Sequence, residues 1–256
     1  MPEAIRIKIP DDVAERYAII SGDQNPLHLD DHFAKRAGFN GAIVHGMLTL
    51  ALCYESIFSQ LKDQRKLEHL SVRFREPLYP GATLCIHSNP QGNALSVTTN
   101  MNQSLFKDFD LVWGAADRNA QHPFTTPTLL EAFTPVKIVL TTRMVEAYQS
   151  FMTTLLPNYR RDSPPLFLLA QNLIVQLLKH LDPTHPLRDH RVLHLAQDLT
   201  IRGTLTVNQE IILTGGVTQK SHKMGQDFLH FYQNFSAQDG KFQMQAKGFG
   251  VVQRLA

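Results

Sequence analysis

The sequence predicts an α+β protein in which two long buried helices are each wrapped by a curved antiparallel sheet. Residues 42–61 and 166–181 are apolar on nearly all sides, as a helix enclosed by a sheet must be. After each of these segments the hydrophobic period changes to two, which is typical of strands. Helices that pack on one face of an antiparallel sheet define the α+β class.

Turn residues and changes of period divide the first half into a strand, three helices and four further strands. Residues 5–9 alternate and are expected to form the opening strand, after which Asp11 can cap a helix over residues 12–20. Gly38 is expected to end the next, short helix, and the long apolar helix begins near Gly46. The four strands that follow are expected at residues 71–74, 83–89, 94–102 and 105–116.

A proline-rich segment separates two halves of similar layout. Residues 119–135 contain Pro123, Pro127 and Pro135 among Thr and Gln, which is typical of a linker. The sequence therefore predicts an N-terminal domain, a linker and a C-terminal domain over residues 1–121, 122–135 and 136–256.

The second half repeats the element order of the first. A strand, a helix, a long apolar helix and a strand-rich tail are expected at residues 136–140, 143–155, 166–181 and 193–252. Residues 201–205 (IRGTL) also resemble residues 74–78 (FREPL), and a polar turn and a strand follow in both places. The matching order and this echo together favour a duplicated domain.

The composition excludes several classes of protein. The formal net charge of the 256 residues is +2 and the basic residues form no long run, which argues against a nucleic-acid partner. The two cysteines and twelve histidines show no metal-type spacing, and two cysteines are too few for a disulfide framework. Neither a signal peptide nor a membrane span is expected, because the longest apolar segments carry polar residues. A soluble protein of a reducing compartment, the cytoplasm, is therefore expected.

The most informative segment is an irregular loop over residues 21–28, Ser-Gly-Asp-Gln-Asn-Pro-Leu-His. Gly22 permits a tight bend and Pro26 stiffens its exit. Asp23 and His28 can therefore converge, although on a regular helix they would diverge. A carboxylate that faces an imidazole can bind one water between them, deprotonate it and return a proton elsewhere. We name this pair the dyad.

A second part of the site is expected where the first long helix begins. The segment Val44-His45-Gly46-Met47 opens that helix, where backbone N–H groups lack partners and the dipole is positive. Gly46 would let a thioester carbonyl approach this backbone and find an oxyanion hole. His45 is more simply interpreted as a residue that caps the helix or is buried with a hydrogen bond.

These residues carry a family resemblance. From Tyr17 to Ala34 the chain resembles the signature of MaoC-like enoyl-CoA hydratases. That signature is an aromatic residue, one or two residues, an aliphatic one, a small one, Gly-Asp-x-Asn-Pro-aliphatic-His, five residues and then Ala or Ser. Residues 41–47 and 75–81 also resemble the family's lead into its helix and its next strand and turn. The resemblance covers residues 5–116. The second half resembles the family only in layout and lacks the Gly-Asp-x-Asn-Pro-x-His motif.

The resemblance implies a double hot-dog fold with one active site, on the N-terminal half. It implies reversible hydration of trans-2-enoyl thioesters to (R)-3-hydroxyacyl thioesters, with Asp23 and His28 activating the water. The amide of Gly46 would bind the thioester oxygen, and Asn25 would shape the loop or orient the dyad. Ser21, His45 and Met47 would bind substrate or support the site. No metal or other cofactor is implied, because coenzyme A belongs to the substrate, and double hot-dogs can form a homodimer.

Three alternatives stay open. Because hydration is reversible, the chain could be a 3-hydroxyacyl-acyl-carrier-protein dehydratase of fatty-acid synthesis. A non-catalytic acyl-thioester-binding protein would not need both residues of the dyad, and a thioesterase would need a carboxylate at the carbonyl carbon.

Some features of the second half have a plain and a functional interpretation. The plain interpretation of residues 166–178 is that they belong to the hydrophobic core. Because the second half lacks the Gly-Asp-x-Asn-Pro-x-His loop, this helix could also line an acyl pocket, and Ala170 is a position at which to test that. Arg160-Arg161 and His190-Arg191 could receive the phosphates of coenzyme A, although short basic pairs are usually solvated surface. The histidines outside the motif, His194 among them, are interpreted as surface or packing residues.

Overall fold

The computed structural model describes residues 4–61, 65–88, 95–114, 124–162, 164–181 and 189–255. The elements of the first half are β1 (Ile5–Lys8), α1 (Val13–Ser21), α2 (Pro26–Leu29), α3 (Asp31–Arg36), α4 (Gly46–Phe58), β2 (Lys66–Phe74), β3 (Thr83–Ser88), β4 (Leu95–Thr99) and β5 (Phe106–Gly114). Those of the second half are β6 (Glu131–Ala132), β7 (Val136–Val139), α5 (Thr142–Leu155), α6 (Leu166–Ala170), α7 (Asn172–Leu181), β8 (His190–Gly203), β9 (Glu210–Lys223), β10 (Gln226–Ala237) and β11 (Phe242–Arg254). The predicted elements occur in the predicted order, but the structure adds the short elements α2 and β6 and divides the second apolar helix into α6 and α7.

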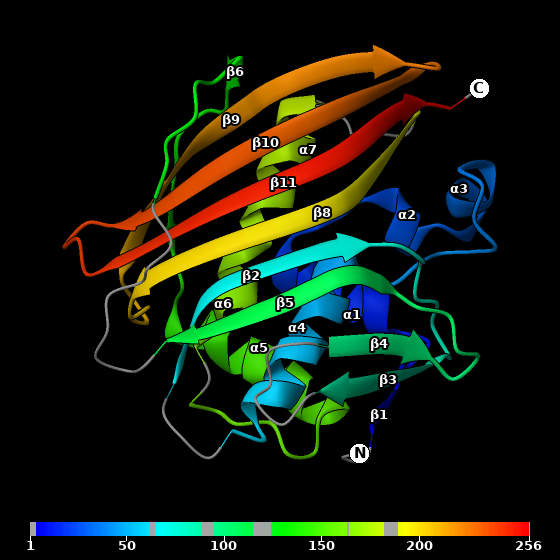
Figure 1. Cartoon of the computed structure of the whole chain (residues 1–256), viewed down its shortest axis with the longest axis horizontal. Coiled ribbons are helices and arrows are strands. Elements are labelled where there is room, and N and C mark those ends of the chain that lie inside the picture. Colours follow the sequence, from blue (N-terminus) through cyan, green and yellow to red (C-terminus); the bar gives the residue numbers. More distant parts are fainter. Residues whose placement is uncertain are drawn as a thin grey trace.

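One large antiparallel sheet runs through both halves. Its order is β5-β2-β8-β11-β10-β9-β6, with β7 also paired to β9, while β1, β3 and β4 form a smaller sheet. The halves join edge to edge where β2 pairs with β8, with Leu70 opposite Leu199. Figure 1 shows α4 behind β2 and β5, and α7 behind the strands of the second half. The fold is an α+β double hot-dog, as predicted.

The first central helix, α4, begins at Gly46 as expected, and every residue after Gly46 is buried. Helix α4 also contacts α6 of the second half, where Tyr54 packs against Phe167. An all-round apolar sequence therefore has a physical cause here, because each face of the helix meets protein.

The prediction of one continuous helix over residues 166–181 is wrong. The helix is interrupted at Gln171, between α6 and α7. Here the side-chain amide of Asn172 donates to the carbonyl oxygens of Leu168 and Leu169, at 3.4 and 3.1 Å. These carbonyls would accept from backbone N–H groups in a continuous helix, so the side chain competes with the helical ladder. The Gln171 side chain at the break is fully buried.

Two smaller expectations also differ from the structure. The position before the first helix is occupied by Asp12 rather than Asp11, and the Asp12 side chain makes no capping hydrogen bond. Strand β2 begins at Lys66, earlier than the predicted start at 71. The buried residues Leu67 and Leu70 are three apart, across a register shift between Leu67 and His69, so strict alternation does not mark this end of the strand.

The domain boundaries stay a prediction. Residues 121 and 122 lie outside the described part of the chain, and β6, inside the expected linker, pairs with β9 of the second half. Cys53 and Cys85 are free and buried, and the described residues contain no helix with the length and apolar character needed to cross a membrane.

Candidate active site

The loop between α1 and α2 is shaped by a relay of side-chain hydrogen bonds. Gly22 ends α1 in the left-handed conformation, with φ of 76°. Ser21 Oγ accepts from the Asp23 N–H at 3.2 Å, and Asp23 Oδ1 accepts from the Asn25 N–H at 3.1 Å. Asn25 Oδ1 in turn accepts from the Leu27 N–H at 3.1 Å and so caps α2. Each polar residue fixes the one that follows, and the relay ends at the helix that carries His28.

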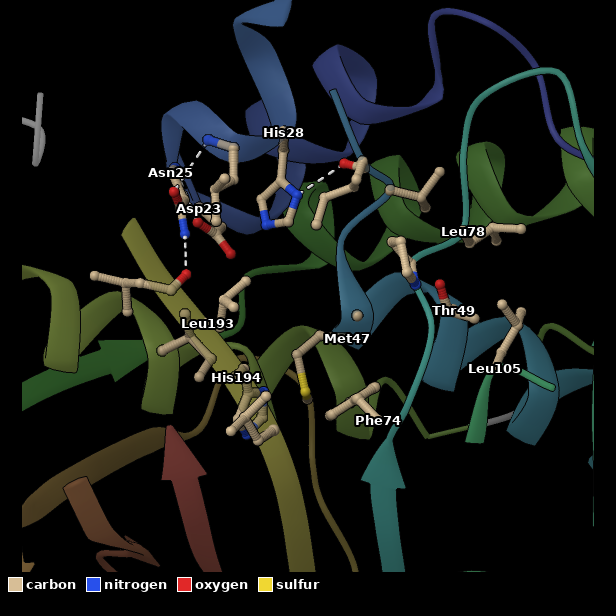
Figure 2. A pocket seen from close by; sticks show the side chains of 18 of the residues that line it. Asp23, Asn25, His28, Met47, Thr49, Phe74, Leu78, Leu105, Leu193 and His194 are labelled. Atoms are coloured by element: carbon tan, nitrogen blue, oxygen red, sulfur yellow. Dashed lines mark hydrogen bonds between the residues drawn. The ribbon is translucent and has the colours of Figure 1, made fainter. Parts of the chain in front are cut away.

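His28 is held by one ring nitrogen, which leaves the other free for chemistry. Its Nδ1 lies 2.8 Å from the Ile43 carbonyl oxygen, and since a carbonyl only accepts, Nδ1 carries the proton. The neutral ring then keeps a lone pair on Nε2. Burial lowers the pKa of His28, against the opposing effects of the Asp23 charge and the Ile43 bond. His28 is therefore a neutral base, and Figure 2 shows its ring beside the Asp23 side chain.

His45 supports the dyad from the start of α4. Its ring stacks on that of His28 with centroids 3.8 Å apart, and its Nε2 lies 3.2 Å from the Asp23 carbonyl oxygen. Tyr17 packs edge-on against it at 5.1 Å. The ring makes no capping bond to α4, so of the two plain interpretations the buried, hydrogen-bonded one fits.

The dyad and His45 form a compact polar cluster. One potential metal-ligand atom from each of Asp23, His28 and His45 lies within 4.8 Å of the other two. At this spacing the three groups could together bind one water molecule or one cation. The prediction that no metal is needed remains to be tested.

A pocket opens in front of the dyad, with an otherwise largely apolar wall. Asp23, Asn25 and His28 line one end, and Gly46 and Met47 line the start of α4 (Figure 2). Gly46 is the first residue of α4 and lines the pocket, and the first N–H groups of a helix lack intrahelical partners. A Cβ added at Gly46 would lie 3.1 Å from Cε1 of Phe74, which also lines the pocket. Ser21 is absent from the pocket lining formed by the described residues, and its role is in the loop.

The second half supplies much of the opposite wall. Its lining residues come from α7, β8 and β10 and are Ile174, Leu177, Val192, Leu193, His194, Leu195 and Phe231. The expected contribution of the second apolar helix is therefore present, through Ile174 and Leu177. Ala170, the expected test position, is fully buried in the core and lies outside the described lining. The interruption at Gln171 separates it from the residues that face the pocket.

His194 was expected to be a surface or packing residue, but it lies in the pocket wall. Burial lowers its pKa to about 4, so the ring is neutral near pH 7. The basic pairs lie elsewhere: Arg160 is paired with Asp162, and Arg191 donates to the Ala37 carbonyl oxygen. Neither arginine is among the described residues that line the pocket.

The residue of the second half that contacts the Asp23 carboxylate was not predicted from the sequence. The side-chain amide of Gln171 donates to Asp23 Oδ2 at 2.8 Å. Asn25 makes a second cross-half bond, from its Nδ2 to the Val192 carbonyl oxygen at 3.2 Å. The one available signal was a Gln-Asn pair inside an otherwise apolar run, 148 residues from Asp23.

Comparison with known proteins agrees with this geometry. Residues 2–104 match the family model described as MaoC like domain. These residues form a MaoC-like domain. The MaoC-like domain includes the whole motif loop, the start of α4 and strands β2 to β4.

Two curated relatives are similar to this MaoC-like domain. The chain is 36% identical over 87 residues to the peroxisomal multifunctional enzyme type 2 of Mus musculus, covering 33% of this chain and 12% of that protein. It is 42% identical over 67 residues to the peroxisomal enoyl-CoA hydratase 2 of Arabidopsis thaliana, covering 25% of this chain and 22% of that one. The chain thus matches less than a quarter of the length of either relative.

The MaoC-like domain and the second half together match a solved structure. It is a conserved protein from Mycobacterium tuberculosis described as having a double hot-dog fold, with a TM-score of 0.63 and 12% identity. The match covers 97% of this chain and 93% of that one. At this identity the similarity shows the fold of both halves.

Proposed function

We propose that this protein reversibly hydrates trans-2-enoyl thioesters to (R)-3-hydroxyacyl thioesters, with enoyl-CoA as substrate. The observation that carries the proposal is the neutral His28, fixed by Ile43, beside the Asp23 carboxylate at the end of an apolar pocket. The relatives named enoyl-CoA hydratase 2 and the MaoC-like domain support it. The (R) configuration rests on the family resemblance.

The residues suit each proton and electron movement of this reaction. A water held between Asp23 and His28 loses one proton to the dyad, and its oxygen forms a bond to C3. The C2–C3 π electrons move toward the thioester, whose oxygen becomes negative and is stabilised by the Gly46 N–H. The dyad then returns a proton to C2. The sum is addition of one water, and the reverse sequence is dehydration.

The pocket suits an acyl chain. Its wall beyond the dyad is largely apolar, although Arg75, Glu76 and His194 also line it. The wall comes from both halves, so the second half replaces the acyl-binding surface that a separate subunit would supply. Exclusion of water from this wall would strengthen the interaction of the Gly46 dipole with the developing charge. Coenzyme A and acyl carrier protein share the same thioester arm, so the described pocket residues do not distinguish between the two carriers.

The direct test is an assay with crotonyl-CoA and longer trans-2-enoyl-CoAs, which follows loss of the conjugated enoyl-thioester absorbance. We expect hydration by the wild type and nearly none by Asp23→Asn. The product is expected to give no NADH with an (S)-specific 3-hydroxyacyl-CoA dehydrogenase and NADH with an (R)-specific one. Absence of hydration on every chain length would overturn the proposal. Assays with acyl-carrier-protein thioesters would identify the preferred carrier.

Location and assembly remain proposals. The two named relatives are peroxisomal, whereas the composition favoured the cytoplasm. Fluorescent fusions at each end of the chain would decide between these compartments. Light scattering would test whether two double hot-dogs form a homodimer.

A further inference from the structure

Gln171 occupies an unusual place, at the break between α6 and α7 of the half that has no dyad. Its side chain is fully buried and makes hydrogen bonds on both sides. Its Nε2 donates to Asp23 Oδ2 at 2.8 Å, and its Oε1 accepts from the Tyr17 hydroxyl at 3.2 Å. The residue is absent from the described pocket lining, so it acts behind Asp23 rather than on the substrate.

The direction of both bonds follows from chemistry. A carboxylate only accepts, so the amide nitrogen must face Asp23 and the amide oxygen must face Tyr17. Burial and the Asp23 charge raise the pKa of Tyr17, so its hydroxyl keeps the proton that it donates. The Asp23 carboxylate therefore sets the orientation of the Gln171 amide, and the Tyr17 hydroxyl holds its Oε1 in that orientation.

We propose that Gln171 is a positioning residue for catalysis, which holds the Asp23 carboxylate in place for the water that Asp23 and His28 share. Asn25 N–H holds Oδ1 and Gln171 holds Oδ2, so both oxygens of Asp23 are fixed. The second half, without a dyad of its own, thus completes the active site of the first. This inference rests on the proposed hydratase function.

The helix break is part of the same arrangement. The Asn172 side chain binds the Leu168 and Leu169 carbonyl oxygens and so stabilises the interruption at Gln171. A break inside a buried helix leaves backbone groups that need partners, which costs stability unless they are supplied. Here the interruption presents the Gln171 amide to Asp23.

The test uses the full chain and separates positioning from folding. Gln171→Met keeps the length of the side chain but removes the donor. A hydrogen bond to a charged group suggests a loss in kcat of roughly 10- to 100-fold. We expect KM for crotonyl-CoA to stay nearly constant, because Gln171 does not line the pocket. The comparison variant is Asn172→Ala, which weakens the break but leaves the Gln171 donor in place, and it should lower Tm and lower kcat by less than Gln171→Met does.

A second set of variants tests the coupling. Tyr17→Phe removes the group that orients Gln171 and should lower kcat by less than Gln171→Met does. The double variant Tyr17→Phe with Gln171→Met should be no slower than Gln171→Met alone, because the two side chains act on Asp23 in series. Additive losses would show that Tyr17 acts independently of Gln171 and would overturn the coupling from Tyr17 through Gln171 to Asp23.

The pH dependence of Gln171→Glu activity is a readout that would not change if Gln171 had only a structural role. Two carboxyl groups at hydrogen-bond distance share one proton, and the singly protonated pair keeps a donor to Asp23. The other titratable groups that face this pair are Tyr17, His28 and His45, and all three are held neutral by burial. Activity of Gln171→Glu relative to wild type should therefore fall as pH rises and the shared proton is lost.

The outcomes separate the two proposals. An active wild type whose kcat is unchanged by Gln171→Met overturns this inference and leaves the hydratase function standing. Equal losses of kcat in Gln171→Met and Asn172→Ala also overturn it, because the break alone would then explain both. A wild type with no hydratase activity overturns both proposals.

Discussion

The rings of His28 and His45 stack face to face with centroids 3.8 Å apart, in the interior of the protein. Two imidazoles this close cannot both take up a proton without strong repulsion. Burial and then the neighbouring His28 lower the pKa of His45 well below its ordinary value. The site is therefore built around neutral histidines.

The first prediction concerns stability at low pH. Below pH 6.5 the unfolded chain protonates histidines that stay neutral when folded, so the histidine contribution is full above that pH and falls as pH drops. For His194, whose folded pKa is about 4, the change from 6.5 corresponds to roughly 3 kcal/mol. When Tm is measured from pH 8 to pH 4, it should start to fall below pH 6.5. The fall should be less steep for His194→Phe than for the wild type. An equal slope in both proteins, in low and high salt, would contradict this.

The second prediction concerns the dyad. Asp23→Asn and His28→Ala should each remove most hydration of crotonyl-CoA while circular dichroism stays native. The double variant should be little slower than either single one, since the two residues act on one water. Near-normal turnover by either single variant would remove the assignment.

The third prediction concerns the oxyanion donor. Gly46→Ala should lower kcat by roughly 100-fold, the effect of losing an oxyanion contact, because its methyl group blocks the approach of the thioester oxygen. The methyl group would also lie 3.1 Å from Phe74. The control is Gly46→Ala with Phe74→Leu, which relieves that crowding. Recovery of full activity in the double variant would assign the loss to crowding rather than to the donor.

The fourth prediction concerns acyl length. Leu177→Trp should slow long enoyl-CoAs more than crotonyl-CoA, because Leu177 lies in the pocket wall. Ala170→Trp should instead lower Tm sharply, since Ala170 is buried in the core and overpacking typically costs about 1–3 kcal/mol. Equal slowing of all chain lengths by Leu177→Trp would exclude a pocket role for α7.

The fifth prediction concerns metal. The cluster of Asp23, His28 and His45 is compact enough to hold a cation. Dialysis against EDTA should leave the rate of crotonyl-CoA hydration unchanged, because the dyad alone activates the water. A loss that is restored by one added divalent metal, with that metal bound stoichiometrically, would show the opposite.

The parts that the sequence predicted well are local ones. The loop from Ser21 to His28 is held by hydrogen bonds between residues two apart, so its geometry follows from neighbours in the sequence. The start of α4 at Gly46 follows from the same kind of local signal. Both halves of the fold follow from hydrophobic period and from family resemblance.

The features of the structure that the sequence did not predict depend on contacts between residues far apart in the chain. Gln171 lies 148 residues from Asp23, and a Gln-Asn pair in an apolar run does not identify the partner of the glutamine. The interruption beside it depends on the Asn172 side chain, so helix periodicity carried through to 181 and assigned Ala170 to the wrong face. His194 carries no local motif, and only the pairing of β2 with β8 brings its strand to the pocket.

The pairing of β2 with β8 has a consequence for the order of events during synthesis on the ribosome. The dyad emerges early, but β2 has no partner on one edge until β8, which starts at His190, has been made. An unpaired strand edge is a site for wrong association. We therefore expect the nascent N-terminal half to expose this edge of β2, and the proposed active site to be completed only after most of the chain has left the ribosome.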